Sequence, residues 1–372
     1  SLSFASVTLA LVSIAPAFAA PAGNLLKRAA IPSYALTYAP YTYLQSGEGW
    51  FPSDIATHVK HMSVENDFKN VSTSVTLQTL NNFDSSTYLT SYDNVENNPA
   101  WLTSTYGKPD SKGYSAAPAT IIAVEKNGFV DVFYFYFYSY NHGSLVLGSR
   151  VDNHVGDWEH SMDFSPSDSD KTRKETDQKC LDSLLNRGSA QNVYYSAHSS
   201  GTAYTYSAVQ KVGVRPVVYS AAGSHANYAT AGTQKIYPIV GNIVTDTTDA
   251  GSYWDVAQNY RGYYYDTASN TFTSAGGVGV GGTEQTAEGV NWLSWLGMWG
   301  DEQYPDSDKR QSCALGVSII DRQSHYEASL LTRDQIDDLC HYQSGPTGPL
   351  DKNLGRTAVC QKEDNCTIKT KL

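Results

Sequence analysis

The stretch that most constrains the fold is FVDVFYFYFYSY, residues 129–140, where bulky side chains follow one another almost without a break. Neighbouring side chains of an extended strand point to opposite faces of its sheet. The alternation therefore assigns one aromatic series to each face: Phe133, Phe135 and Phe137 on one, and Val132, Tyr134, Tyr136 and Tyr138 on the other. Because both faces are bulky, we expect a central strand that is covered on both sides.

Three further runs have the same extended character. Residues 156–164, 192–198 and 215–223 combine aromatic or β-branched residues with small residues at their ends. Together with the first strand they predict one sheet-rich core over residues 129–222. The abundance of tyrosine (27) and glycine (29) also favours a mainly β protein with many turns.

Helical signals are few and short. A cap at Ser53 or Asp54 predicts a short helix with Ile55, Val59 and Met62 on one face. A capping box over residues 332–335 predicts another near the end of the chain. The glycine-rich tract 274–282 predicts a flexible loop. A phosphate cradle is disfavoured there because no lysine follows and no strand leads into a helix.

The N-terminal residues look like a targeting segment rather than structure. Residues 4–20 form an apolar run that ends in small residues of the A-x-A type, which predicts a signal peptide over residues 1–20. Lys27 and Arg28 then predict a dibasic processing site at the end of a short propeptide, residues 21–28. We expect a single domain over residues 29–372. We also expect a secreted protein, and passage through the vacuole or residence in it is compatible with this expectation.

The cysteines fit an oxidising compartment. Four of the five lie in the last sixty residues, where apolar runs are scarce, so disulfides are expected to staple an irregular C-terminal part. These four are Cys313, Cys340, Cys360 and Cys366. Cys180 is then the unpaired one, and Asn70 and Asn365 begin glycosylation sequons that matter only in a secreted chain.

The charge and the hydropathy pattern exclude several partners. The formal net charge is −11 and no basic stripe is present, which argues against nucleic acid and against a polybasic contact with anionic lipid. No segment after the leader has about 18 uninterrupted apolar residues, so no transmembrane segment is predicted.

Coordinating side chains are concentrated in NHVGDWEH, residues 153–160. In a strand, Asp157 and Glu159 share one face, and Trp158 with its neighbour at 160 takes the other. Two adjacent carboxylates need something positive between them, either a basic side chain or a divalent cation. With His154 as third ligand, the set suits Ca²⁺, Mg²⁺, Mn²⁺ or non-haem iron, and Zn²⁺ is also compatible. The alternative is a solvent-facing polar strand with Trp158 packed inward.

Two later histidines follow the same local phrase, Tyr-Ser-Ala, at a strand end. His198 and His225 are therefore candidates for the same cleft and for a general acid or base. Five further residues are expected to line that cleft: Asp152, His160, Ser199, Ser224 and Tyr228. A serine-hydrolase triad is disfavoured because no strand-to-helix elbow is present.

Two alternatives concern carbohydrate. Same-face neighbours on a strand lie about 6.6 Å apart, so Asp157 and Glu159 approach the spacing of a glycosidase pair, although such pairs normally come from different strands. Trp292, Trp295 and Trp299 would share one helical face as a sugar-binding surface. The competing interpretation is that they anchor the C-terminal part to the sheet.

Several motifs in one order resemble the vacuolar protein sorting-associated protein 62 family of fungi and plants. They are YAPYTYLQSGEGWFPSDI, FYFYFYSYNHG, NHVGDWEH, YYSAHSSG, RPVVYSAAGSHANY, WLGMWGD and GPTGPLDKN. The family name implies a link to trafficking and no mechanism.

The core HVGDWEH followed by SAHSSG is also similar to the signature of the necrosis- and ethylene-inducing-like proteins, secreted cytolysins with a central β-sandwich. This resemblance implies a β-sandwich here and makes His154, Asp157 and Glu159 divalent-cation ligands. The chain departs from that signature at Asn153, where the family has glycine, and at Gly156, where it has histidine. Asp152 is the nearest candidate for the family's further acidic ligand.

Three functions follow from these features. In the first, the cation presents a cell-surface glycan or lipid headgroup for binding or membrane perturbation. In the second, it is the Lewis acid of a hydrolase or lyase that acts on a polysaccharide or phosphodiester. In the third, the cation is purely structural. The sequence does not predict an oligomeric state.

Overall fold

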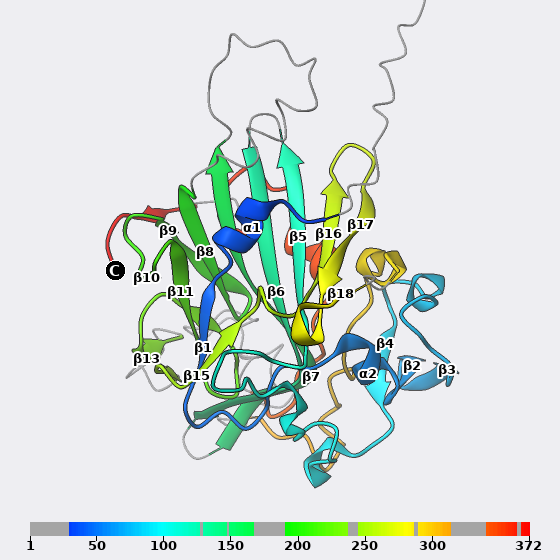
Figure 1. Ribbon diagram of the computed structural model, residues 1–372. Helices are drawn as coiled ribbons and strands as arrows, with labels where there is room; N and C mark the ends of the chain where they lie inside the picture. Colours follow the sequence, from blue (N-terminus) through cyan, green and yellow to red (C-terminus); the bar gives the residue numbers. More distant parts are fainter. Residues whose placement is uncertain are drawn as a thin grey trace, which may run out of the picture.

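The computed structural model describes residues 30–126, 129–146, 149–166, 190–236, 245–285, 289–313, 340–362 and 366–372. Two sheets packed face to face form a central β-sandwich, and the helices are few and short (Figure 1). The prediction of a mainly β fold is therefore confirmed.

The larger sheet has nine strands in the order β18-β17-β16-β5-β6-β7-β8-β9-β19. Their bounds are β5 Ala119–Lys126, β6 Phe129–Val146, β7 Ser149–Pro166, β8 Asn192–Ala197, β9 Ser200–Thr205, β16 Tyr260–Asp266, β17 Thr271–Val278, β18 Glu284–Gln285 and β19 Ile368–Lys369. The antiparallel hairpin β6–β7 lies at its centre, and its register runs from Phe129 opposite Pro166 to Val146 opposite Ser149.

The smaller sheet has the order β10-β11-β1-β15, with β12 paired to β11. Its strands are β1 Tyr41–Leu44, β10 Lys211–Val212, β11 Arg215–Ser220, β12 Asn227–Tyr228 and β15 Ser252–Asp255. The peripheral strands are β2 Met62–Asn66, β3 Lys69–Ser72 and β4 Tyr88–Ser91 in one sheet, and β13 Gly232–Lys235 with β14 Thr245–Thr248 in another.

The helices are α1 Ser33–Thr37 and α2 Ile55–Val59, with the 3-10 turns η1 Leu80–Asn82, η2 Val95–Asn97, η3 Thr105–Gly107, η4 Val280–Gly282, η5 Asn291–Ser294 and η8 Pro349–Lys352. The helix predicted after Ser53 or Asp54 is α2, but it ends at Val59, and Met62, which was expected on its face, begins strand β2 instead. Asp54 is its cap, because the Asp54 carboxylate accepts the Thr57 N–H at 2.8 Å.

Strand β6 is covered on both sides, as its sequence predicts. The tyrosine face packs against the smaller sheet, in a core that includes Leu44 of β1 and Trp254 of β15. The Tyr134 hydroxyl donates to the carbonyl of Ala35 in α1 at 2.6 Å, and the Tyr136 and Ser161 hydroxyls lie 2.8 Å apart. A buried tyrosine thus keeps a partner for its polar end while its ring fills the core.

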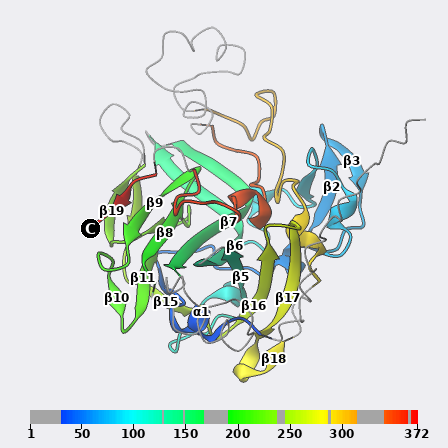
Figure 2. The same ribbon diagram turned by 90° about the horizontal axis from the view of Figure 1, so that it is seen from above.

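The phenylalanine face packs against the opposite layer. Trp158 of β7 lies 4.7 Å from the Phe137 ring, measured between centroids, and contacts Trp292 and Trp299. All three tryptophans of the 292–299 segment are buried, so the segment is a hydrophobic anchor and not a sugar-binding surface. Seen from above, α1 and the smaller sheet lie on one side of the larger sheet and η8 on the other (Figure 2).

The prediction of a flexible loop over residues 274–282 is wrong in its first half. Residues up to Val278 belong to β17, which pairs with β16. A Cβ on Gly277 would lie 2.2 Å from the Tyr260 carbonyl oxygen, so glycine is needed there for close strand contact rather than for mobility.

Four cysteines form the two disulfides Cys313–Cys340 and Cys360–Cys366, which confirms the stapled C-terminal part. Other predictions concern residues outside the described ranges. These are the signal peptide and propeptide with Lys27 and Arg28, the unpaired Cys180, the 332–335 capping box and Asn365. Within the described ranges, no helix has the length and apolar character to cross a membrane.

One core position of β7 is a carboxylic acid. Asp163 is 3 % exposed, and neither of its oxygens has a hydrogen-bond partner within the described residues. Burial raises its pKa well above the usual value. Burial thus favours the neutral form of this acid in the folded protein.

Asp163→Asn should make stability less dependent on pH. Because the pKa of Asp163 is higher in the folded protein than in the unfolded chain, its contribution to the free energy of unfolding is fully present below the unfolded pKa near 4. This contribution falls as the pH rises, by at most about 1.4 kcal/mol per pH unit. Urea unfolding at pH 4.5 and 7.5 should therefore show a smaller pH difference for Asp163→Asn than for the wild type. The exposed Asp110→Asn is the control, and an identical pH difference in all three proteins would contradict the assignment.

Candidate functional site

Strand β7 places the acidic pair inside the molecule. Asp157 lies opposite Tyr138 of β6 and Glu159 lies opposite Tyr136, so both carboxylates share the tyrosine face. Each residue is only 5 % exposed. The alternative of a solvent-facing polar strand is therefore excluded, although Trp158 does pack on the other side.

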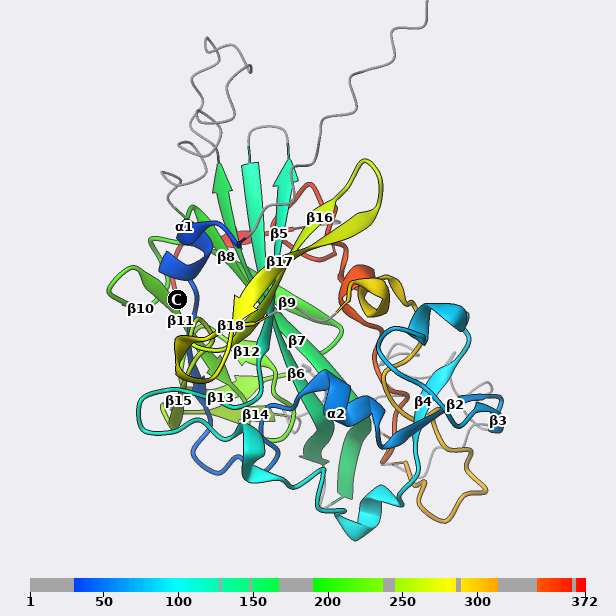
Figure 3. The same cartoon turned by 45° about the vertical axis from the view of Figure 1, so that its right-hand side comes forward.

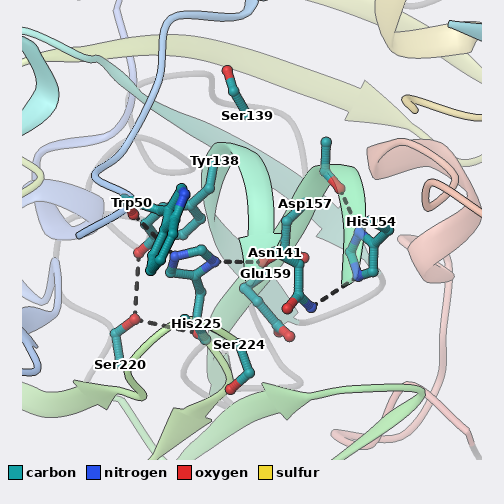
Figure 4. A network of polar contacts seen from close by, with 12 residues as sticks. Trp50, Tyr138, Ser139, Asn141, His154, Asp157, Glu159, Ser220, Ser224 and His225 are labelled. Atoms are coloured by element: carbon teal, nitrogen blue, oxygen red, sulfur yellow. Dashed lines mark hydrogen bonds and ion pairs between the residues drawn. The ribbon is translucent and has the colours of Figure 1, made fainter. Parts of the chain in front are cut away.

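Gly156 brings His154 to the same side of the strand as the acidic pair. Val155 and Trp158 belong to one core cluster, although strict alternation would separate residues three apart. Gly156 absorbs the change with φ of +65°, and a Cβ there would lie 2.1 Å from the Trp299 carbonyl oxygen. His154, next to Val155, is thereby directed to the side of Asp157 (Figure 4).

The hydrogen bonds of His154 define its tautomer. The side-chain oxygen of Asn141 accepts the Gly143 N–H at 2.7 Å, so its amide nitrogen is the group 2.8 Å from His154 Nε2. Nε2 therefore accepts, and Nδ1 donates to the Gly156 carbonyl oxygen at 2.7 Å. The Nε2 lone pair of His154 therefore faces the Asn141 amide.

His225 is held as an imidazolium beside Asp157. Nδ1 lies 2.9 Å from Asp157 Oδ2, and Nε2 lies 3.0 Å from the Trp50 carbonyl oxygen (Figure 4). Both partners can only accept, so both ring nitrogens carry protons. Burial alone would lower its pKa, but the charge of Glu48 and the bond to Asp157 raise it to about 10. The Tyr138 ring stacks on it at 3.7 Å.

Glu48 joins this group from the N-terminal part of the chain. One carboxylate oxygen accepts the N–H groups of Gly49 and Trp50, and the other accepts the Gly223 N–H at 2.9 Å. The second oxygen is also 3.6 Å from His225 Nε2. Burial would raise the pKa of Glu48, but the His225 charge and these hydrogen bonds lower it.

Glu159 has a weaker set of partners. The Ser196 hydroxyl donates to it, and the same hydroxyl accepts the His160 N–H at 2.7 Å. Burial and the neighbouring charge of Asp157 raise the pKa of Glu159 to about 8. Lys352 of η8 is a basic group that interacts electrostatically with both carboxylates.

A second imidazolium group lies nearby. His198 Nε2 is 2.9 Å from Asp246 of β14, and its Nδ1 is 3.6 Å from Asp152. Burial would lower the pKa of His198, but these two carboxylates raise it well above the usual value. Asp246 also accepts the hydroxyls of Ser224 and Tyr228, each at 2.7 Å.

Three residues of these two groups have a left-handed backbone that is unfavourable for residues other than glycine. They are Asp152 (φ 66°), His198 (φ 54°) and His225 (φ 55°). Such strain persists only where the surrounding structure imposes it, and it concentrates at functional sites. The side chains of two of these residues, His198 and His225, are each held by contacts to buried carboxylates.

The structure brings most of the predicted site residues into two sets and places the other three elsewhere. Asp157, Glu159 and His225 come together, and so do Asp152, His198, Ser224 and Tyr228 around Asp246. His154 lies on the same side but bonds to Asn141. His160 is fully buried on the phenylalanine face, 5.1 Å from the Phe135 ring, and therefore does not line the polar site. Ser199 is exposed and joins none of these bonds.

Five partners were not predicted: Glu48, Asn141, Ser196, Asp246 and Lys352. Four of them, Glu48, Asn141, Ser196 and Lys352, stand in the motifs that resemble the vacuolar protein sorting-associated protein 62 family, which was the signal available in the sequence. Asp246 stands in none of these motifs. Within the described residues, no three His, Cys, Asp or Glu side chains are arranged as a ready metal site. A cation at Asp157 and Glu159 would need His154 to leave Asn141, or ligand and water oxygens to complete its shell.

Gly156→Ala should lower the free energy of unfolding by at least about 2 kcal/mol, because a left-handed alanine and a forced shift of Trp299 each cost about 1–3 kcal/mol. Urea denaturation measures it. Gly213→Ala is the matched control, since Gly213 has φ of +62° but nothing within 4 Å of an added Cβ. Equal losses in the two variants would show that the Trp299 contact is unimportant.

The Cys313–Cys340 disulfide should hold the site strand in place. The Asp152 N–H donates to the Cys340 carbonyl at 2.8 Å, and Asn153 exchanges backbone hydrogen bonds with His341 and Gln343. Cys313→Ser/Cys340→Ser should therefore speed amide hydrogen exchange at Asp152 and Asn153. Cys360→Ser/Cys366→Ser removes the other disulfide and should not. Equal exchange at these two amides in both variants would contradict the role.

Comparison with known proteins gives a family. No protein-family model matches the chain. Among solved structures, the NLPPya complex with mannosamine is similar at 12 % identity and TM-score 0.26, over 64 % of this chain and 74 % of that one. Necrosis and Ethylene inducing Protein 2, from the agent of cocoa's Witches Broom disease, gives 14 % and 0.27 over 61 % and 74 %. Likeness at these TM-scores is too low to support conclusions.

The sequence comparisons are stronger. A Saccharomyces cerevisiae protein described as vacuolar protein sorting-associated protein TDA6 is 31 % identical over 371 residues, which cover 89 % of this chain and 68 % of the relative. Vacuolar protein sorting-associated protein 62 of the same yeast is 29 % identical over 91 % of this chain and 69 % of its own. The chain therefore belongs to the vacuolar protein sorting-associated protein 62 family.

Proposed function

We propose that this chain is a binding protein for a cell-surface glycan or a lipid headgroup, and that a divalent cation at Asp157 and Glu159 mediates the binding. The observation that carries the proposal is an excess of acidic over basic side chains around Asp157 and Glu159. Five carboxyl groups meet three basic groups: Glu48, Asp152, Asp157, Glu159 and Asp246, against His198, His225 and Lys352. His198 and His225 are each shared by two carboxyl groups, so the acids outnumber the bases by two. A divalent cation beside Asp157 would offset this excess and favour the ionised form of Glu159, whose pKa is raised.

His154 supports the same proposal. A histidine that binds a metal usually donates its other ring N–H to a carbonyl or carboxylate, which fixes the tautomer. His154 already does so, since Nδ1 donates to the Gly156 carbonyl oxygen. Its Nε2 lone pair would become available when Asn141 turns away. The residues that would hold the ion are thus Asp157, Glu159 and His154.

The ligand class follows from the donor set. Two carboxylates with one imidazole suit Ca²⁺, Mg²⁺ or Mn²⁺, and Zn²⁺ is also compatible. Such ions complete their shells with oxygen atoms, which sugar hydroxyls and phosphate headgroups supply. The overall charge of −11 disfavours direct contact with anionic groups, so a bridging cation would be needed for a phosphate.

A binding role is preferred over a hydrolase or lyase. His225, one candidate acid or base, has both ring nitrogens engaged as donors to Asp157 and Trp50, so it offers no lone pair to a substrate. The paired cysteines favour an oxidising compartment. With the names of the two yeast relatives, they support passage through the secretory pathway to the vacuole or the cell surface.

Metal content of the purified protein tests the proposal, because loss of Asp157 and Glu159 removes the ion's main ligands. The wild type should contain one equivalent of metal and Asp157→Ala/Glu159→Ala none. The exposed Asp110→Ala/Glu284→Ala removes the same charge elsewhere and should keep the metal. Glycan and lipid arrays with and without chelator then test the binding role.

If all three folded proteins lack metal and chelator leaves ligand binding unchanged, the cation is not part of the function. If metal is bound but no array ligand is retained, the ion is structural. Turnover of a polysaccharide or phosphodiester by the wild type would instead favour the enzyme.

A further inference from the structure

Strand β3 is an exposed edge. In the three-stranded sheet β3-β2-β4, β4 is bridged to Met298, but no described strand pairs with the outer side of β3. This sheet stands to one side of the sandwich, with β3 outermost (Figure 3). Phe68 and Val71 beside or within this strand are 48 % and 53 % exposed. An open apolar edge invites pairing with another chain, so it needs protection.

Asn70 lies in the middle of this edge. It starts the sequence Asn70-Val71-Ser72 and is exposed. It pairs with Glu65, while Ser72 pairs with Val64, so the register shifts and Val71 bulges between them. The Asn70 side chain makes no hydrogen bond to any described residue, so its amide is accessible to a large substituent.

We propose that Asn70 carries an N-linked glycan that covers the β3 edge. The co-reactant is an oligosaccharide linked to a polyprenyl pyrophosphate, supplied by the lumenal glycosylation machinery. The Asn70 amide nitrogen forms a bond to C1 of the first sugar and loses one proton to a base. The bond between C1 and the pyrophosphate oxygen breaks, and the pyrophosphate leaves with the electron pair. No oxidant or reductant is involved.

The shielding role follows from size and position. A glycan on Asn70 is large and hydrated, so it hinders a second chain from reaching the free side of β3. A lysine within an edge strand gives similar protection, and Lys69 already stands at the start of β3, 79 % exposed in its side chain. The Asn70 glycan would protect the centre of the strand, where Lys69 does not reach.

The modification is tested by intact mass of the full chain, secreted from a eukaryotic host, before and after treatment with a peptide N-glycosidase. Asn365→Gln serves as the background, because it removes the other sequon. Asn70→Gln and Ser72→Ala should then lose the mass of one glycan, whereas Ser72→Thr should retain it. An unmodified Asn70 peptide in secreted, disulfide-bonded protein would overturn the proposal.

Shielding is tested separately by sedimentation of the same proteins. Asn70→Gln should self-associate more than the glycosylated chain, and adding Val71→Lys should restore the monomer fraction. Both results would support a cover for the edge. Equal sedimentation with and without the glycan would overturn the shielding role. Neither experiment depends on metal or ligand, so its outcome is independent of the proposed function.

Discussion

The two-sided burial of strand β6 is the constraint on which the rest of the structure depends. Its phenylalanines require one apolar layer and its tyrosines another, so the chain must cover a single sheet twice. The smaller sheet satisfies the tyrosine face, where phenolic hydroxyls find carbonyl and hydroxyl partners. The tryptophan segment satisfies the other. Because β7 is paired with β6 along its length, its side chains inherit the same two environments.

The acidic site is a consequence of the pairing between β7 and β6. Asp157 and Glu159 fall on the tyrosine face near the end of the sandwich, where the smaller sheet and its connecting turns supply polar rather than apolar groups. Burying carboxylates is costly unless they are paired. His225 and His198 provide the pairing, at the expense of an unfavourable left-handed backbone at both positions. Backbone strain at the two histidines is thus offset by the neutralisation of the buried carboxylates.

Local regularities made part of this predictable from sequence. Alternation alone gives the faces of Phe135, Tyr136, Asp157 and Glu159, because a strand's geometry is set by adjacent residues. Glu48, Asp246 and Lys352 could not be found that way, since their approach to the site depends on how distant segments pack. Composition misled at Gly277, where glycine permits close contact and not mobility. His160 differs from the other cleft candidates because it lies two residues after Trp158 and therefore points to the same face of β7 as Trp158.

The wide separation in sequence of the site's members has a kinetic meaning. Glu48 stands near the start of the described chain, the β7 acids in the middle and Lys352 near its end, so no partial chain contains the whole arrangement. Contacts between such distant residues form late, because long loops must close first. The complete charge pattern therefore arises only when both ends have docked on the sandwich. Competence at this site would therefore report completion of folding.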